Sequence, residues 1–358
     1  MSSLHVLASA LRDPALVLEF GEPEWERLLV LAELSRLTAT LGDRIERAGL
    51  WGELPERVRE RFHAGRILAD FRNRRLRWEM ACLERVLRKA DFEVIVLKGG
   101  AYLLLDLPWA RGRLPADLDL LVAREHLAAM EALLLAEGFA PVKLSSYDQR
   151  YYREWMHELP PLRHPERRVE IDIHHALLPL TARLRADPER LWGAARAVAG
   201  SRFKVLGPQD MVLHAAVHLF YDSDLNNRLR DLVDLDELLR HFGGGQADFW
   251  QGLVERAKAH GWERPLAYAL AFSHRFLGTP IPQDRPLPAV HPVLARWMNF
   301  LVGRALFPEL PRRFSKITAI ARFLLYARSH YLRMPLKVLL PHLLYKAKAR
   351  LLGHPATP

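Results

Sequence analysis

Cysteine is almost absent from this 358-residue chain, because Cys82 is its single thiol. One cysteine excludes an internal disulfide framework and a multi-cysteine metal site, and it suits the reducing cytoplasm. The chain also lacks any run of about 18 uncharged apolar residues, so no membrane-spanning helix is expected. The N-terminus has no basic run followed by an apolar core, and no secretory signal is expected. These absences predict a cytoplasmic location.

Acidic residues are nearly missing from the C-terminal part of the chain. Between residues 303 and 358, eleven Lys and Arg stand against one acid, Glu309, and this surplus equals the whole net charge of +10. An electrostatic partner is therefore expected at this basic tail, where Pro335 and Pro341 divide the chain into short helices. We favour packing of its apolar side on the rest of the protein. Peripheral contact with an anionic membrane, or contact with a phosphate-bearing acceptor, is the alternative.

The hydrophobic spacing divides the chain into four regions. Residues 1–90 show the three- and four-residue spacing of an N-terminal helical region, and residues 91–184 alternate strand-like and helix-like runs. Residues 185–302 look entirely helical, and residues 303–358 form the basic helical tail. The pattern predicts an α+β protein whose small core is flanked by helical regions on both sides in sequence.

Two carboxylates lie two residues apart on a predicted strand, in Asp117-Leu118-Asp119. Side chains two apart on a strand share a face, so Asp117 and Asp119 are expected to project together. Close carboxylates repel each other unless a cation lies between them, and Mg²⁺ favours hard oxygen ligands together with phosphate oxygens. An isolated Asp-x-Asp is more often a solvated strand end, so the motif needs support from elsewhere in the chain.

That support comes from both sides of the motif. Upstream, Lys98-Gly99-Gly100 ends one predicted strand and opens a helix, where backbone N–H groups and a lysine charge favour phosphate. Downstream, alternation places Glu170, Asp172 and His174 on one face of a third strand, where Asp172 can join the first pair. A structural turn and an edge strand are the respective alternatives. The order and spacing of all three features favour a site.

The same features resemble the bacterial uncharacterised nucleotidyltransferases, a family of the DNA polymerase β-like nucleotidyltransferase superfamily. The resemblance rests on the stretches LKGGAYLLLDLPWARGRLPADLDLLV (97–122), EIDIHHAL (170–177) and HAAVHLFYDSDLNNRLRDLVDLDELL (214–239). The Lys98-Gly99-Gly100 turn stands where the superfamily usually has Gly-Ser, and Ala116 replaces a residue that is often small and polar. The resemblance implies a mixed sheet with flanking helices.

The resemblance also implies two-metal nucleotidyl transfer from an NTP, such as ATP, to an acceptor. Asp117 and Asp119 would hold the Mg²⁺ that bridges the NTP phosphates, and Asp172 would complete the site of a second Mg²⁺. Lys98, Gly99, Gly100, Arg113 and His174 are the expected nucleotide- or acceptor-binding residues. The sequence does not identify the acceptor, and a small molecule, a peptide and a protein are the expected alternatives. Nucleic acid is not favoured, because the aromatic residues are scattered without a stacking pattern.

Other pairs have a structural and a functional interpretation. His214 and His218 share a helix face at metal-like spacing, but a packed pair or a wall of the active site is favoured over a metal site. Arg230 and Asp234 have the spacing of an intrahelical ion pair; alternatively, their helix closes a nucleotide pocket.

Three hypotheses on function are thus distinguished. The first is an active nucleotidyltransferase, the second a catalytically idle binding module of the same fold, and the third a membrane- or nucleic-acid-binding protein acting through its tail. The intact Asp117, Asp119 and Asp172 favour the first. Replacing either Asp117 or Asp119 with Asn is expected to abolish transfer. Because the two carboxylates would repel each other, the same change is expected to stabilise the metal-free protein.

Overall fold

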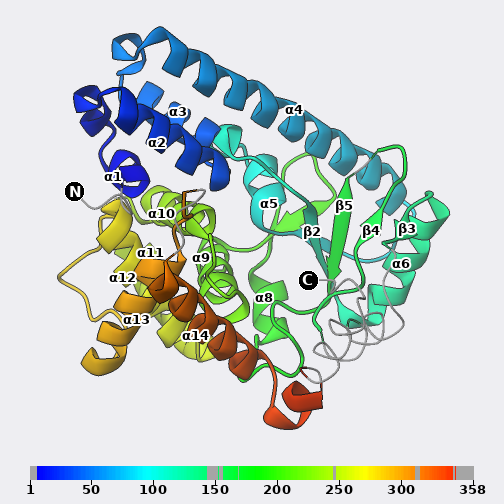
Figure 1. Cartoon of the computed structure of the whole chain (residues 1–358). Coiled ribbons are helices and arrows are strands. Elements are labelled where there is room, and N and C mark those ends of the chain that lie inside the picture. Colours follow the sequence, from blue (N-terminus) through cyan, green and yellow to red (C-terminus); the bar gives the residue numbers. More distant parts are fainter. Residues whose placement is uncertain are drawn as a thin grey trace.

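The computed structural model describes residues 6–142, 152, 156–167, 169–244, 247–310, 315–341 and 343. Its N-terminal helices are α1 (Val6–Arg12), α2 (Glu22–Leu34), α3 (Thr38–Arg47) and α4 (Glu56–Leu87). Helix α4 extends from these helices along one side of the molecule to the sheet (Figure 1). The helical character predicted for the N-terminal region is confirmed.

One mixed sheet follows. Its strands are β1 (Val94–Val96), β2 (Leu118–Val122), β3 (Ala140–Pro141), β4 (Leu162–Arg163), β5 (Glu170–His174), β6 (Arg196–Ala197) and β7 (Phe203–Val205), in the order β3-β4-β5-β2-β1-β7-β6. Strand β2 pairs antiparallel with β1 and parallel with β5. Helices α5 (Lys98–Leu104) and α6 (Leu127–Ala136) lie between the strands in sequence. The α+β class and the mixed sheet are confirmed.

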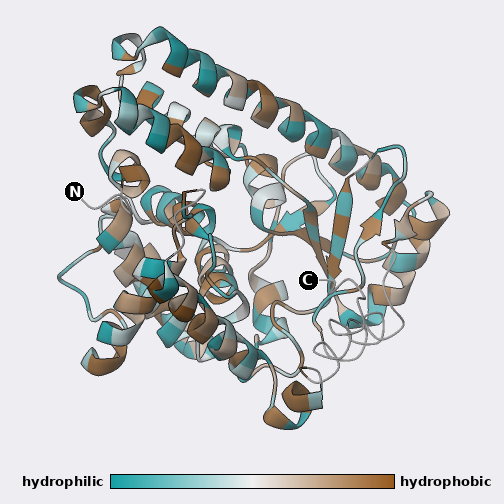
Figure 2. Ribbon diagram, viewed as in Figure 1, coloured by the Kyte–Doolittle hydropathy of each residue, from teal (hydrophilic) through white to brown (hydrophobic). Residues whose placement is uncertain are grey.

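The burial of apolar side chains explains where the strands form. Every residue of β1 and β2 is buried. This agrees with the apolar, β-branched run Val94–Val96 of β1, whereas β2 buries leucines, one valine and Asp119. In β5 polar and apolar residues alternate, as the colours of Figure 2 show, and Ile171 and Ile173 enter the core. The opposite face of β5 is thereby left to polar side chains.

The expectation that the chain is only helical after residue 184 is wrong. Strands β6 and β7 lie in that region, and β7 pairs parallel with β1. Three residues, as in Phe203–Val205, are too few to show an alternating pattern, and their partner strand is more than a hundred residues away in sequence. The four-region division itself stays a prediction.

Helices make up most of the rest of the chain. They are α8 (Pro188–Ala194), α9 (Pro208–Val217), a π-helical turn (His218–Asp222), α10 (Leu229–Gly243), α11 (Ala247–His260), α12 (Glu263–Leu277), α13 (Pro292–Ala305) and α14 (Lys316–Arg333). Helix α1 packs against α12, so the N-terminal helices close onto the C-terminal ones (Figure 1).

A buried ionic network joins these two sets of helices. Arg44 of α3 donates to Asp236 at 2.5 Å and to Glu237 at 3.0 Å, both on α10, and to the Leu11 carbonyl at 2.7 Å. Burial alone would lower the pKa of Arg44, but the charges of Glu237 and Asp236 outweigh it and raise that pKa. All three side chains are at least nine-tenths buried, so the network depends on its pairing.

The loop that leads into β2 is fixed by the N-terminal helices. Thr40 of α3 donates to the Gly112 carbonyl at 2.9 Å, and Asn73 of α4 donates to the carbonyls of Ala110 and Arg111, each at 3.1 Å. These bonds hold the short helical turn Pro108–Gly112, which directly precedes Arg113. The N-terminal helices thereby position the entry to the strand that carries Asp119.

The described part of the basic tail packs on the protein. Helix α14 packs against α13 and against the π-helical turn, where Arg328 donates to the Phe220 carbonyl at 2.8 Å. Five of the tail's basic residues lie outside the described residues, namely Arg312, Arg313, Lys346, Lys348 and Arg350. Among the described residues, no helix combines the length and the apolar character needed to cross a bilayer.

Candidate active site

The three aspartates predicted as ligands lie together at the β2–β5 pair. The parallel register of these strands sets Asp119 directly beside Asp172. Asp117 immediately precedes β2 and is exposed, whereas the Asp119 side chain is only about 5% accessible and Asp172 is half-buried. Two segments more than fifty residues apart in sequence thus bring three carboxylates to one place.

Asp119 is the best-satisfied of the three. Its Oδ1 atom accepts hydrogen bonds from Lys98 Nζ at 2.7 Å and from His174 Nε2 at 3.0 Å. Burial would raise the pKa of Asp119, but the Lys98 charge and the His174 hydrogen bond outweigh it and hold that pKa well below its usual value. Asp119 is therefore a carboxylate anion that the protein itself stabilises.

Asp172, in contrast to Asp119, is poorly stabilised by its neighbours. Its Oδ1 atom is buried and has no hydrogen-bond partner among the described residues. Burial raises the pKa of Asp172 to about 8, and the negative charges of Asp119 and Glu158 add to the shift. The pKa of Asp117 is also raised, first by loss of hydration and then by the charge of Asp119. A cation between these carboxylates would supply the missing partner, so the residues present fit Mg²⁺.

The Lys98-Gly99-Gly100 turn lies against the same carboxylates. Lys98 takes a left-handed backbone conformation, with φ of 45°, at the start of α5. A Cβ on Gly100 would lie 2.7 Å from Val96 Cγ1, and a Cβ on Gly99 would lie 2.1 Å from Arg113 Nη1. Both glycines are therefore needed for close packing, and Gly99 in particular leaves room for the guanidinium.

Arg113 is anchored by a residue of the helical region. Its Nε donates to both carboxylate oxygens of Asp234, at 2.9 and 3.0 Å, and its guanidinium lies 5.6 Å from the ring centre of Tyr102. The expectation of an intrahelical Arg230–Asp234 pair is therefore wrong, because Asp234 turns inward to Arg113. Held in this way, Arg113 places its terminal nitrogen against Gly99.

Two further residues complete the site, and no local sequence pattern indicated them. Glu158 Oε2 lies 3.4 Å from His174 Nδ1, and an isolated β-bridge joins the two residues. His157, Glu158 and His174 offer ligand atoms that all lie within 4.8 Å of one another. His174 therefore connects Asp119 with a second group of potential metal ligands.

His214 borders this arrangement from α9. Burial holds the pKa of His214 well below its usual value, and the positive charges of Lys98 and His218 act in the same direction. The rings of His214 and His218 lie 6.3 Å apart, centre to centre. A neutral His214 adds no positive charge beside Lys98, which suits a wall of the site.

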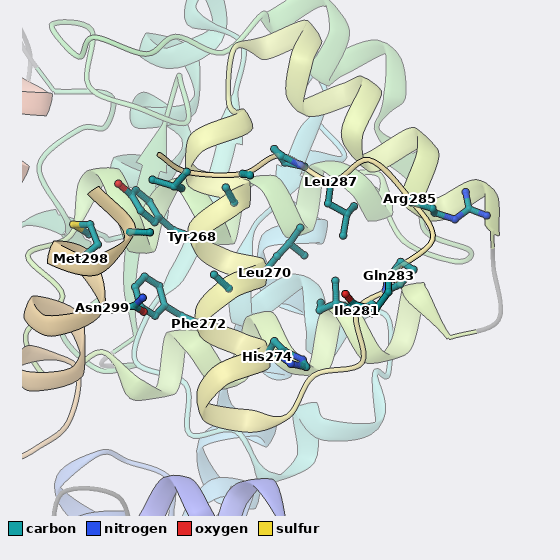
Figure 3. Close-up of a pocket in the computed structure, with 17 residues that line it drawn as sticks. Tyr268, Leu270, Phe272, His274, Ile281, Gln283, Arg285, Leu287, Met298 and Asn299 are labelled. Atoms are coloured by element: carbon teal, nitrogen blue, oxygen red, sulfur yellow. Dashed lines mark hydrogen bonds between the residues drawn. The ribbon is translucent and has the colours of Figure 1, made fainter. Parts of the chain in front are cut away.

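A cavity that none of the three aspartates lines is found in the helical part of the protein. Its volume is about 390 Å³, and it is lined by α12, the segment 281–290 and α13. Figure 3 shows Tyr268, Leu270 and Phe272 along its wall. Its lining is mainly apolar and includes none of the three aspartates. This cavity is therefore separate from the candidate site at the β2–β5 pair.

Comparison with known proteins identifies the family of this chain. Residues 21–278 match a family described as uncharacterised nucleotidyltransferase. The match spans more than half of the chain, and the protein belongs to that family. The matched region contains all eight residues predicted to form the site.

Similarity to other proteins is slight. No curated relative matches the chain. A solved structure, described as an antigenic nucleotidyltransferase-like protein from Paracoccidioides brasiliensis, is similar at 17% identity with a TM-score of 0.32. The similarity covers 55% of this chain and 92% of that one. A match at this level establishes no shared site.

Proposed function

We propose that this protein is a Mg²⁺-dependent nucleotidyltransferase that moves an NMP group from an NTP to a hydroxyl or phosphate acceptor. The proposal rests on the clustering of Asp117, Asp119 and Asp172. A buried oxygen of Asp172 has no hydrogen-bond partner among the described residues. Carboxylates that are held this close together, with one oxygen lacking a hydrogen-bond partner, are typical of a cation site. Family membership supplies the class of reaction.

Each residue would have a distinct part. Asp117 and Asp119 would hold one Mg²⁺, and Asp172 would complete the site of a second ion. The two ions would neutralise phosphate charge and lower the pKa of the attacking hydroxyl. An acceptor oxygen would form a bond to the α-phosphorus while the bond to pyrophosphate breaks, and Asp172 would take the proton.

Two positively charged side chains, Lys98 and Arg113, would assist the transfer. Lys98 holds Asp119 in place and keeps its own charge, because the pairing with Asp119 outweighs the effect of burial and raises the Lys98 pKa. The terminal nitrogens of Arg113, held at Gly99 by the contact of Nε with Asp234, would bind phosphate oxygens. His174 would orient Asp119 through the 3.0 Å bond.

A screen with labelled nucleotides tests this function. The protein is incubated with Mg²⁺ and each α-labelled NTP, with and without cell extract, and label on any other molecule is sought. An idle binding module of the same fold would bind NTP and transfer no label under any of these conditions.

Asp172→Asn and Glu170→Gln form a matched pair for this screen. Both residues project from the same face of β5, but Glu170 makes no hydrogen bond to Asp119, Lys98 or His174. We expect Asp172→Asn to lower transfer by about 10³-fold, since a lost metal ligand removes several kcal/mol of charge stabilisation. Glu170→Gln should retain most of it. The reverse order would assign the third ligand to Glu170.

Helix α14 favours a second function, attachment to an anionic membrane surface. Ile317, Ile320, Phe323 and Leu324 are all exposed on this helix, and Lys316–Arg333 contains no acidic residue. Arg322 pairs with Glu309 at 3.1 Å, and it is the one cation of α14 with an acidic partner among the described residues. Exposed apolar side chains beside the remaining positive charge complement an anionic lipid surface. The buried side of the helix meanwhile packs on the protein.

Flotation with liposomes tests that attachment. We expect the protein to float with vesicles of phosphatidylserine and phosphatidylcholine, and less with phosphatidylcholine alone, because each surface cation adds about 1 kcal/mol on anionic lipid. Phe323→Ser should weaken flotation, whereas Ile67→Ser, at a comparably exposed position on α4, should not. Equal flotation of the two variants, or none for the native protein, would exclude a lipid-binding α14.

A further inference from the structure

A second cavity, polar in its lining, lies between the N-terminal helices and α10. Its volume is about 330 Å³. The end of α2 contributes Leu34, Ser35 and Arg36. The segment that leads into α10 contributes Asp224, Asn226, Asn227 and Arg228, and the first turn of α10 contributes Arg230 and Asp231. None of these residues was among the predicted site residues, and the reaction proposed above uses none of them.

This polar cavity adjoins Asp117. Arg230 Nη1 donates to the carbonyl of Leu114, three residues before Asp117, at 3.3 Å. Arg36 and Asp117 are close enough to affect one another, because the negative charge of Asp117 raises the Arg36 pKa against the larger lowering by burial and by Arg230. The polar cavity therefore opens beside the outermost of the three carboxylates.

Positive charge exceeds negative charge within it. Asp231 is shared between Arg228 and Arg230, at 3.4 and 3.5 Å, and Asp224 Oδ1 accepts from the backbone N–H of Asn226 at 3.0 Å. The Arg36 side chain forms no ion pair or hydrogen bond with another described residue. Three guanidinium groups against two carboxylates leave a cationic cavity with one arginine unpaired.

The backbone around the polar cavity is strained and held in place. Arg36 and Asn227 both line it in left-handed conformations, with φ of 59° and 53°, and Leu225 between its walls has φ of 61°. Asn227 Nδ2 donates to the Leu34 carbonyl at 3.0 Å, which joins the two walls. Non-glycine residues rarely adopt this conformation, and such strain is concentrated at binding sites.

An unsatisfied hydroxyl adds an independent indication. Ser35 lines the polar cavity and is 3% exposed, yet its Oγ has no hydrogen-bond partner among the described residues. A buried hydroxyl without a partner is costly unless a ligand supplies one. Guanidinium groups with a nearby hydroxyl are the donors that bind phosphate.

We infer that the polar cavity binds a phosphate group of a substrate, through Arg36 and Arg228 together with Ser35. The phosphate belongs either to the terminal part of the NTP or to a phosphorylated acceptor. This inference rests on the proposed function for the identity of the substrate. Phosphate binding itself requires neither metal nor the three aspartates.

Titration with inorganic phosphate in EDTA, followed by calorimetry on the full chain, tests the inference. Arg36→Asn removes the unpaired charge with a residue that tolerates a positive φ, so folding should be kept, and thermal unfolding confirms it. We expect phosphate binding to weaken at least tenfold in Arg36→Asn and in Arg228→Gln. Arg57→Gln, which removes an exposed arginine on α4, should bind as the native protein does.

The source of the phosphate is decided by repeating the titration with saturating Mg²⁺ and α,β-methylene-ATP. Competition assigns the polar cavity to the terminal phosphates of the nucleotide, and undiminished binding assigns it to the acceptor. Absence of phosphate binding, or equal weakening in Arg36→Asn and Arg57→Gln, overturns the inference. Arg36-dependent binding in a protein that transfers no label would instead overturn the proposed function alone.

Discussion

Replacing Asp119 with asparagine should abolish nucleotidyl transfer and also destabilise the protein. Transfer is expected to fall by about 10³-fold or more, because the proposed metal site would lose a ligand. The free energy of unfolding should fall by roughly 2 kcal/mol, since Lys98 and His174 lose the anion that both contact. Label transfer and denaturant unfolding in EDTA measure the two effects.

The sign of the stability change separates Asp119 from Asp172. The sequence predicted that loss of Asp117 or Asp119 from a repelling pair would stabilise the metal-free protein. We expect the same sign for Asp172, whose buried Oδ1 has no partner among the described residues, so Asp172→Asn should lose activity and gain stability in EDTA. For Asp119 the sign is reversed by Lys98 and His174. If both variants shift stability in the same direction, the two carboxylates are not in the different environments described.

The largest loss of stability should follow from replacing Arg44 with methionine. This substitution leaves Asp236 and Glu237 buried without their shared cation, and Asp236 is fully inaccessible. Breaking a buried ion pair in this way costs about 3–5 kcal/mol. Chemical denaturation followed by circular dichroism measures the change.

Arg47 provides the control for Arg44. It also contacts Glu237, at 3.3 Å, but its side chain is 44% exposed. Water screens such a pair, so Arg47→Gln should cost no more than about 1 kcal/mol. Similar losses in the two variants would show that the Arg44 network is not what holds the N-terminal helices to α10.

The sequence predicted those parts of the fold that depend on local pattern. The runs around β1, β2 and β5 are apolar, β-branched or alternating, and their carboxylates lie two apart, so both strands and candidate ligands were visible. Strands β6 and β7 were missed because each is two or three residues long and is defined by its partner in the sheet. Periodicity carries no information about such pairing.

The rest of the candidate site depends on packing between distant segments. Arg113 meets Asp234 across 121 residues of sequence, and the helical spacing pointed to Arg230 instead. Glu158 and Arg36 belong to no motif in the sequence, and the other wall of the polar cavity lies within the stretch 214–239 without any pattern that indicates a cavity. The sequence therefore indicated the carboxylates together with Lys98 and His174, which contact Asp119, but not Glu158 or the pairing of Arg113 with Asp234.

The most direct test of the account uses one NTP labelled in parallel at its α- and γ-phosphates. The reaction is run with Mg²⁺ and the acceptor found in the screen, and the products are separated. Nucleotidyl transfer predicts that the α-label moves to the acceptor while the γ-label leaves in pyrophosphate, and that Asp119→Asn stops both. Transfer of the γ-label to the acceptor, or transfer that survives Asp119→Asn, would contradict the assignment of function and site.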